Sequence, residues 1–288
     1  ADTVHFPVQV DTKGLLGENT LEVAVNQQLL PEQYYENNAM KLRNYIEVTG
    51  DETNPLLDVT FDGQYIFDGD IVSPNPEILM IMRDQNPYLF KTDTVGIDIF
   101  HFKCEECPAE RVNLSSSEIS WTPATDKEPF KITYAPMNLE DAMHKLEVNV
   151  EDASGNKSGS EPYSINFEVI NKSTITHFYP YPNPFSSSVR FVFTLTGSEI
   201  PDEILIRVLT VSGRVVREIT QDEIGPLRIG NNETAYAWDG RDEFGDQLAN
   251  GVYLYKVYIQ LNGQQVELRE TAGDKGFTNG YGKLYLLR

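Results

Sequence analysis

Cysteine, tryptophan and basic residues are all scarce in this sequence of 288 residues. Its two cysteines cannot form a disulfide framework for a chain of this length, so the cores must be hydrophobic. Lys and Arg number 23 against 44 Asp and Glu, which gives a formal net charge of −21. Binding to nucleic acid or to an anionic membrane requires a run of basic residues that neutralises phosphates, and no such run occurs. We therefore expect no nucleic-acid partner.

Long hydrophobic runs are also missing. No apolar stretch approaches the ~20 residues that cross a bilayer as a helix, so we expect no membrane insertion. Hydrophobic residues make up 40% and charged residues 23% of the sequence, which is close to the globular average and argues against wholesale disorder. The length fits two or three domains of ~100–150 residues each.

Apolar and polar residues alternate with a period of two in several segments, including 146–150, 163–169 and 189–195. Each segment would bury one face and solvate the other, as strands of an antiparallel sandwich do. Turn signals that contain Asp, Asn, Ser and Gly separate these segments at short intervals. Only 32–39 and 139–144 could each form a short turn of helix. The pattern therefore predicts an all-β fold built from antiparallel sandwiches.

Two polar stretches predict domain boundaries. The first covers residues 49–55, and the second covers residues 171–174 and precedes the proline-rich segment 179–185. Proline fixes φ and favours an extended conformation in the residue before it, so the second boundary gives a stiff entry into the last block. The predicted blocks are residues 1–50, 51–172 and 173–288. The first block is short for a sandwich, and we expect the end of a truncated domain rather than a segment that packs on the second block.

Cys104 and Cys107 lie in a segment, 101–107, that offers two thiols and the imidazole of His101. A structural zinc site usually takes four such ligands, and a second cysteine pair is missing. A redox-active pair would begin a helix, whereas these cysteines follow a strand-like run. Residues three apart on one strand seldom converge on a substrate, which disfavours a cysteine nucleophile with a histidine base. We expect a small surface disulfide, with free thiols, metal binding and catalysis as the alternatives.

Acidic turns are a second candidate site, because carboxylates are calcium ligands. The densest are 68–70 and the segment that contains Asp239, Asp242 and Asp246. Neither has the spacing of an EF-hand loop. Aspartate is also favoured in turns because its side chain bonds to its own backbone. We interpret these acids as turn residues, with calcium at Asp239, Asp242 and Asp246 as the alternative, and we expect no other cofactor.

Catalytic motifs are missing from the sequence. The remaining histidines, His5, His144 and His177, are scattered, and we interpret them as structural. No Gly-x-Ser-x-Gly elbow, phosphate-binding loop or dinucleotide-binding turn occurs. Trp121 and Trp238 are too far apart to indicate an aromatic platform for sugars, although tyrosines could build one.

Five motifs follow one another in the last block. They are Tyr181-Pro182-Asn183-Pro184-Phe185, Val211-Ser212-Gly213-Arg214-Val215-Val216, Tyr236-Ala237-Trp238-Asp239-Gly240-Arg241-Asp242, Asn250-Gly251-Val252-Tyr253 and Lys283-Leu284-Tyr285-Leu286-Leu287-Arg288. In this order they resemble the C-terminal sorting domains carried by cargo of the type IX secretion system of Bacteroidota, which are related to the FlgD-like immunoglobulin-type domain. The resemblance implies an immunoglobulin-like sandwich over 173–288 that the outer-membrane secretion machinery recognises.

The resemblance extends upstream. Residues 57–63, 68–76 and 150–156 resemble the β-sandwich region that follows the catalytic domain in gingipain-like (peptidase family C25) and PorU-like proteins. Residues 17–21 and 31–38 resemble the end of a CARDB-type adhesion module of the same proteins. The resemblance implies consecutive immunoglobulin-like sandwiches in a secreted or outer-membrane cell-surface protein. It also implies a peptidase-like domain upstream in the same polypeptide and no enzymatic activity in this chain.

Gly251, Tyr253, Lys283 and Arg288 are the residues that we expect partners to recognise. If the strand over 283–288 lies at a sheet edge, a partner could bind it by strand addition. In the alternative interpretation, Gly251 only provides a turn and Tyr253 only fills the core. Two other functions stay open. A cell-surface adhesion or carbohydrate-binding module would need a row of exposed aromatic side chains on one sheet face, and an enzyme would need a pocket that gathers titratable groups from distant strands.

Overall fold

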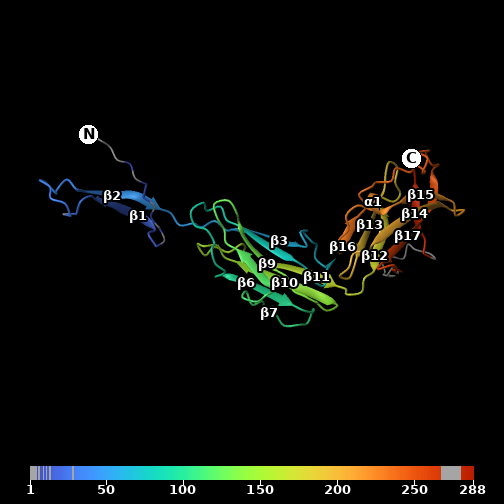
Figure 1. Ribbon diagram of the computed structural model, residues 1–288, viewed down its shortest axis with the longest axis horizontal. Coiled ribbons are helices and arrows are strands. Elements are labelled where there is room, and N and C mark those ends of the chain that lie inside the picture. Colours follow the sequence, from blue (N-terminus) through green and yellow to red (C-terminus); the bar gives the residue numbers. More distant parts are fainter. Residues whose placement is uncertain are drawn as a thin grey trace.

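The computed structural model describes residues 5–288 apart from positions 6, 9, 11, 13, 28 and 267–279 (Figure 1). Strands make up nearly all of the regular structure of the described residues, and their one helix has four residues. The strands form a hairpin followed by two β-sandwiches. The predicted all-β fold is therefore confirmed.

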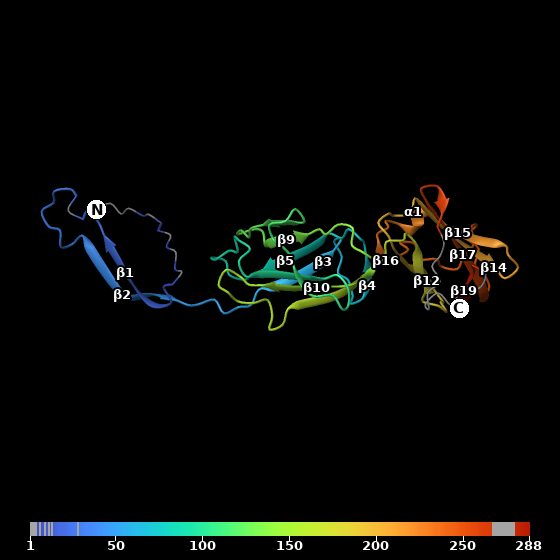
Figure 2. The same cartoon turned by 90° about the horizontal axis from the view of Figure 1, so that it is seen from below.

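The hairpin consists of the antiparallel strands β1 (Gly17–Ala24) and β2 (Ala39–Val48). Figures 1 and 2 place it at one end of the molecule, where an extended segment joins it to the middle sandwich. Most of its side chains are exposed, including the cross-strand pair Val23 and Met40. A two-stranded hairpin buries little apolar surface by itself, and the described residues before β3 form no core of their own.

The middle sandwich has two sheets, with the strand orders β4-β11-β10-β6-β7 and β3-β5-β9-β8. Its strands are β3 (Leu56–Phe61), β4 (Asp70–Val72), β5 (Ile78–Arg83), β6 (Ile97–Phe102), β7 (Glu110–Arg111), β8 (Ile119–Thr122), β9 (Phe130–Tyr134), β10 (Ala142–Val150) and β11 (Tyr163–Val169). Alternate residues of β10 are buried, and Leu146 and Val148 are fully enclosed. They pack in one core with Ile78, Ile99 and Phe167. The alternation in the sequence thus produces a core between the two sheets.

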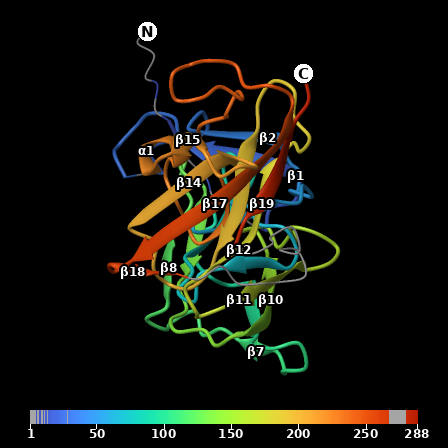
Figure 3. The same cartoon turned by 90° about the vertical axis from the view of Figure 1, so that its right-hand side faces the viewer.

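The C-terminal sandwich also has two sheets, with the orders β12-β13-β16 and β15-β14-β17-β18, and β19 pairs with β17. Its strands are β12 (Ile175–Tyr181), β13 (Arg190–Leu195), β14 (Glu203–Thr210), β15 (Val215–Ile219), β16 (Gly230–Glu233), β17 (Gly251–Leu261), β18 (Gln264–Gln265) and β19 (Gly282–Leu286). Its core contains Phe191, Phe193, Trp238 and Leu284, all fully buried. Figure 3 shows β19 lying beside β17.

The helix turns predicted over 32–39 and 139–144 do not form. The first segment is a turn that leads into β2, and β10 begins at Ala142 within the second, because strand pairing with β11 outweighs the weak local preference for helix. The short helix α1 (Gln221–Ile224) was not expected from the sequence. No helix among the described residues is long and apolar enough to span a membrane.

The two sandwiches contact each other where β4 meets β16. The side-chain amide of Asn231 donates a hydrogen bond of 3.0 Å to Oδ1 of Asp70. Gly230 has φ of +92°, and a Cβ at this position would lie 2.8 Å from the carbonyl oxygen of Ile71. The close approach of these two edge strands therefore requires glycine.

Candidate functional site

The outer edge of the C-terminal strand β19 is occupied by the proline-rich motif. The side-chain amide of Asn183 donates a hydrogen bond of 3.0 Å to the carbonyl oxygen of Lys283, and its Oδ1 accepts one of 2.9 Å from the N–H of Tyr285. Phe185 then donates to the carbonyl of Tyr285 at 2.9 Å and accepts from the N–H of Leu287 at 2.8 Å. Four backbone groups of this segment point away from β17: the carbonyl of Lys283, the N–H and carbonyl of Tyr285, and the N–H of Leu287. Each of them thus has a hydrogen-bond partner.

This arrangement corrects one expectation from the sequence. Strand addition requires a row of unpaired backbone groups, and the segment around Asn183 and Phe185 already fills that row on β19. The side chains of Lys283, Tyr285 and Leu287 remain exposed. A partner could therefore contact these side chains, while the free edge that strand addition needs is absent between Lys283 and Leu287.

Arg288 is held by the segment that connects β16 to β17. Its N–H donates to Oδ1 of Asn250 at 3.0 Å, and the Asn250 amide donates to the carbonyl of Arg288, also at 3.0 Å. Its guanidinium donates to the carbonyl oxygens of Asp239 and Leu248. Gly240 has φ of +75°, and a Cβ there would lie 2.8 Å from the Arg288 guanidinium, so this contact depends on glycine.

Aromatic side chains support the site from within. Trp238 lies 5.5 Å from Phe185 and 6.3 Å from Tyr253 between ring centroids. Its indole N–H donates to the carbonyl oxygen of Arg241 at 2.7 Å. Tyr253 is 7% exposed and donates to the carbonyl of Ala249 at 2.8 Å. Burial raises the pKa of its hydroxyl.

The residues that we expected partners to recognise thus fall into two groups, those of the β17–β19 pair and those with charged side chains at the surface. Gly251 and Tyr253 face Leu286 and Leu284 across the β17–β19 pair. The ring of Tyr253 belongs to the core, so it is not available for direct contact with a partner. Lys283 and Arg288 present charged groups at the surface. The guanidinium of Arg288 also donates hydrogen bonds to carbonyl oxygens of its own chain.

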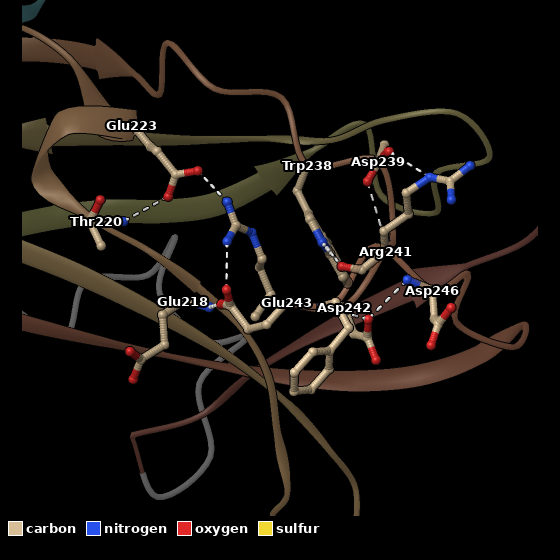
Figure 4. Close-up of polar contacts among 11 residues, drawn as sticks. Glu218, Thr220, Glu223, Trp238, Asp239, Arg241, Asp242, Glu243 and Asp246 are labelled. Carbon is tan, nitrogen blue, oxygen red and sulfur yellow. Dashed lines mark hydrogen bonds and ion pairs between the residues drawn. The ribbon is translucent and has the colours of Figure 1, made fainter.

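The acidic segment around Asp239, Asp242 and Asp246 is a folded turn (Figure 4). Oδ1 of Asp242 accepts hydrogen bonds of 3.0 Å from the N–H groups of Phe244 and Asp246. Asp239 accepts from the N–H of Arg241 at 3.1 Å, and the Arg241 guanidinium lies 3.1 Å from its other oxygen. The three carboxylates form no ligand cluster among the described residues, and two of them are engaged by the turn itself.

Glu243 occupies the edge of β15, on the opposite side of the sheet from β19. Its N–H donates to the carbonyl oxygen of Val216 at 3.0 Å, and its carboxylate accepts from the N–H of Glu218 at 2.6 Å (Figure 4). The carboxylate also pairs with Arg217 at 3.0 Å, and the same guanidinium pairs with Glu223 of α1. One side chain and one backbone group therefore occupy the edge of β15, much as Asn183 and Phe185 occupy the edge of β19.

Cys104 and Cys107 form a disulfide in the turn between β6 and β7. An ion pair of 2.7 Å between Lys103 and Glu110 spans the base of this turn. His101 points into the middle sandwich, where it hydrogen-bonds to Tyr134 and His144. It is therefore already engaged and cannot act as a base for either cysteine.

Sequence reasoning missed the pairing of two buried histidines. His101 is 2% exposed and His144 is 1% exposed, and their Nε2 and Nδ1 atoms lie 3.0 Å apart. Both residues are in phase with the buried positions of β6 and β10, which is the signal that could have revealed them. They border a cavity of about 410 Å³ together with Tyr134.

The backbone carbonyl of Glu140 determines which ring nitrogens of His144 and His101 carry a proton. The carbonyl oxygen of Glu140 lies 2.9 Å from His144 Nε2 and can only accept, so Nε2 carries the proton and Nδ1 accepts from His101 Nε2. His101 Nδ1 then accepts from the hydroxyl of Tyr134 at 3.0 Å. Burial, and next the neighbouring His144, lower the pKa of His101 to about 4, and burial lowers the pKa of His144. Both histidines are therefore neutral at pH 7.

No protein-family model and no curated protein matches the sequence. Among solved structures, dimeric latent PorU from Porphyromonas gingivalis is 18% identical over 88% of this chain, with a TM-score of 0.33. This chain spans 23% of that PorU chain. Fibronectin(III)-like modules of CbhA from Clostridium thermocellum are 11% identical, with 80% of this chain and 94% of theirs covered and a TM-score of 0.24. The FN1–FN3 domains of chicken CNTN1 are 11% identical, with 87% and 71% covered and a TM-score of 0.25. At these identities and TM-scores, the likenesses carry no inference about activity or partners.

Proposed function

We propose that this chain is the non-catalytic C-terminal region of a secreted protein with a family C25 peptidase-like domain upstream, and that it targets or docks its parent through the type IX secretion system. The partners would be the outer-membrane secretion machinery and the upstream domain of the same polypeptide. The protein would act in the medium or at the outer-membrane cell surface. The middle sandwich would serve as a rigid spacer.

The convergence of separate sequence motifs around β19 is the observation that carries this proposal. Asn183, Asp239, Asn250 and Tyr253 come from three of the motifs that resemble a sorting domain, and all four contact or pair with β19 or with Arg288 beyond it. A sorting signal has to present one folded surface to a translocon. Segments far apart in the sequence build such a surface here, with the side chains of Lys283, Tyr285 and Leu287 on the outside.

The adhesion or carbohydrate-binding alternative has less support. It needs a row of aromatic side chains on one sheet face, whereas the highly exposed Tyr65, Phe67, Tyr88 and Phe244 all lie outside the strands. Trp121 is on β8, but its ring stacks on Phe130 with the centroids 5.9 Å apart. On the strands, Tyr179 and Tyr181 of β12 are exposed at alternate positions and so share one face. The support for the alternative among the described residues rests on this pair of rings rather than on a longer row.

We infer that the chain has no catalytic activity of its own. The cavity beside His101 and His144 gathers titratable groups, but the two imidazoles are committed to Tyr134 and to the carbonyl of Glu140. No serine or cysteine nucleophile is hydrogen-bonded to either imidazole among the described residues.

A secretion assay tests the proposal. The full chain, placed after a reporter with an export signal, is produced in a bacterium with a type IX system and in an isogenic strain without its outer-membrane translocon. We expect the reporter at the cell surface or in the medium of the first strain and in the periplasm of the second. Periplasmic retention in both strains would refute the proposed function.

A point substitution connects the signal to the exposed face of β19. Deleting 283–288 would remove the buried residues Leu284 and Leu286 and unfold the sandwich, so we choose Lys283→Glu, whose side chain is exposed. We expect delivery to fall several-fold while the melting temperature stays the same. Lys127→Glu, at an exposed position of the middle sandwich, is the matched control and should leave delivery unchanged. Equal delivery by both variants would exclude Lys283 from recognition.

A further inference from the structure

Three aspartates from separate segments meet at the end of the middle sandwich where the hairpin segment joins it. Asp51 precedes β3, Asp84 follows β5 and Asp152 follows β10. One carboxylate oxygen from each lies within 4.8 Å of those of the other two. This is the one group of three acidic, histidine or cysteine ligands that the described residues bring together.

Amide groups hold two of the carboxylates in place. Asp152 is 3% exposed, and its Oδ1 accepts hydrogen bonds of 2.8 Å from the N–H groups of Ser154 and Asn156. Oδ2 of Asp51 accepts from the side-chain amide of Asn86 at 2.9 Å. The Asn156 amide donates to Oδ2 of Asp152 and to the carbonyl oxygen of Asp51, which joins the two segments. These donors orient the carboxylates but neutralise none of their charge.

Asp84 has an oxygen that these donors leave without a partner. Its Oδ1 accepts from the N–H of Asn86 at 3.0 Å, whereas its Oδ2 is completely buried and accepts no hydrogen bond. A buried carboxylate oxygen with no partner is costly, and two neighbouring carboxylates increase the cost. No Lys or Arg of the described ranges forms an ion pair with any of the three acids. A positive charge among the three carboxylates would therefore reduce their repulsion and give Oδ2 of Asp84 a partner.

We propose that Asp51, Asp84 and Asp152 bind one Ca²⁺ ion, with the orphaned Oδ2 of Asp84 as a ligand. Calcium takes oxygen ligands at about 2.3–2.6 Å, so two ligands of one ion lie no more than about 5 Å apart. The three carboxylate oxygens, which lie within 4.8 Å of one another, satisfy this limit. The group contains only oxygen ligands, which suit calcium better than zinc or copper. The hydroxyl of Ser154, which lies 3.3 Å from Asp51, can supply a further ligand.

Calcium at this position has a mechanical consequence. Asp51 belongs to the extended segment after β2, whereas Asp84 and Asp152 belong to the sandwich. The ion would fasten the segment to the ends of β5 and β10 and so limit the movement of the hairpin relative to the sandwich. The site is independent of the proposed secretion role and far along the chain from the motifs around β19.

Calorimetric titration of the full chain with CaCl2, after removal of metals with a chelator, tests the proposal at pH 7.5. We expect one site with a dissociation constant of about 10⁻⁴–10⁻³ M, as in extracellular calcium modules, and a melting temperature that rises with calcium. Asp84→Asn keeps the shape of the side chain and should weaken calcium binding at least tenfold. The same variant should be at least as stable as the parent without calcium, since it removes a buried charge. Asp242→Asn, in the acidic turn, is the matched control and should bind calcium as the parent does.

Three results would overturn the proposal. One is a parent chain with neither heat of binding nor a change in melting temperature. In that case, a higher melting temperature of Asp84→Asn would show that the carboxylates repel one another with no ion between them. Another is an unchanged dissociation constant in Asp84→Asn. The last is loss of binding in Asp242→Asn, which would place the ion in the turn around Asp239.

Discussion

Asn183 accepts a hydrogen bond of 2.9 Å from the backbone N–H of Tyr285, a residue 102 positions later in the chain. The same amide donates to the carbonyl oxygen of Lys283, so it pairs with β19 as one residue of a neighbouring strand would. Phe185 continues the pairing through its own backbone. An exposed strand edge invites pairing with other chains, and a side chain that occupies the edge prevents this.

The first prediction concerns this protection of the edge. Asn183→Ala removes both hydrogen bonds of the amide and leaves two backbone groups of β19 without a protein partner. We expect the free energy of unfolding to fall by about 1–2 kcal/mol, because each such bond contributes about 0.5–1.5 kcal/mol. We also expect the variant to self-associate more readily. Urea denaturation and analytical ultracentrifugation measure the two effects.

Asn149→Ala is the matched control for Asn183→Ala. Asn149 lies on β10 at a half-buried position and should tolerate the change to within about 0.5 kcal/mol. Equal stabilities of the two variants, with no self-association of either, would show that the Asn183 amide does not protect β19.

The second prediction concerns Arg217. Its side chain is 18% exposed, pairs with Glu223 and Glu243, and lies over the ring of Tyr236. We expect Arg217→Met to lower the free energy of unfolding by about 1–2 kcal/mol, since it leaves two carboxylates next to each other without their cation. A double-mutant cycle with Glu223→Gln should give a coupling energy of about 0.5–1.5 kcal/mol. Additive effects of the two substitutions would contradict the bridge between β15 and α1.

The third prediction concerns the disulfide of Cys104 and Cys107. Intact mass spectrometry of protein isolated from its native compartment should show both thiols oxidised, as expected for an exported protein. The double variant Cys104→Ser/Cys107→Ser should lose at most about 2 kcal/mol of stability, because the bond closes a very short loop outside both cores. Free thiols in the native protein, or loss of folding in the double variant, would contradict this.

The strands followed from local patterns in the sequence. The alternation over β10 and β11 is visible in the sequence because each strand has one buried and one exposed face. The short helix α1 was missed because its four residues depend on the neighbouring Thr220, whose N–H donates to Glu223, and on the contact of Ile224 with the core. Such short helices are set by tertiary contacts rather than by propensity.

The contacts of the candidate site could not be predicted from the sequence in the same way. The order of motifs indicated that the last strand matters, but the bond between Asn183 and Tyr285 depends on the path of the loop before β13. The chemistry of Asp84 was hidden for a similar reason, because Asp51 and Asp152 reach it from distant segments. The local periodicity of the sequence carries no information about contacts between residues that are far apart in the chain.

The last prediction concerns the dependence of stability on pH. Burial lowers the pKa of His101 to about 4 in the folded protein, whereas the unfolded chain keeps a value near 6.5. Between these values the unfolded state binds more protons, so stability is complete above pH 6.5 and falls as the pH drops towards 4. His144, whose pKa is also lowered by burial, acts in the same direction. From pH 7 to pH 5 we expect the free energy of unfolding to fall by about 2 kcal/mol through His101 alone.

Comparison of variants isolates this effect from the titration of the many carboxylates, which is common to all of them. His101→Gln should be less stable than the parent at pH 7, because it interrupts the hydrogen bonds to Tyr134 and His144, yet it should lose about 2 kcal/mol less between pH 7 and pH 5. Asn149→Ala removes no titratable group and should show the same pH dependence as the parent. Urea denaturation at the two pH values measures all three proteins. Equal pH dependence in His101→Gln and the parent would mean that the buried pair does not hold its imidazoles neutral.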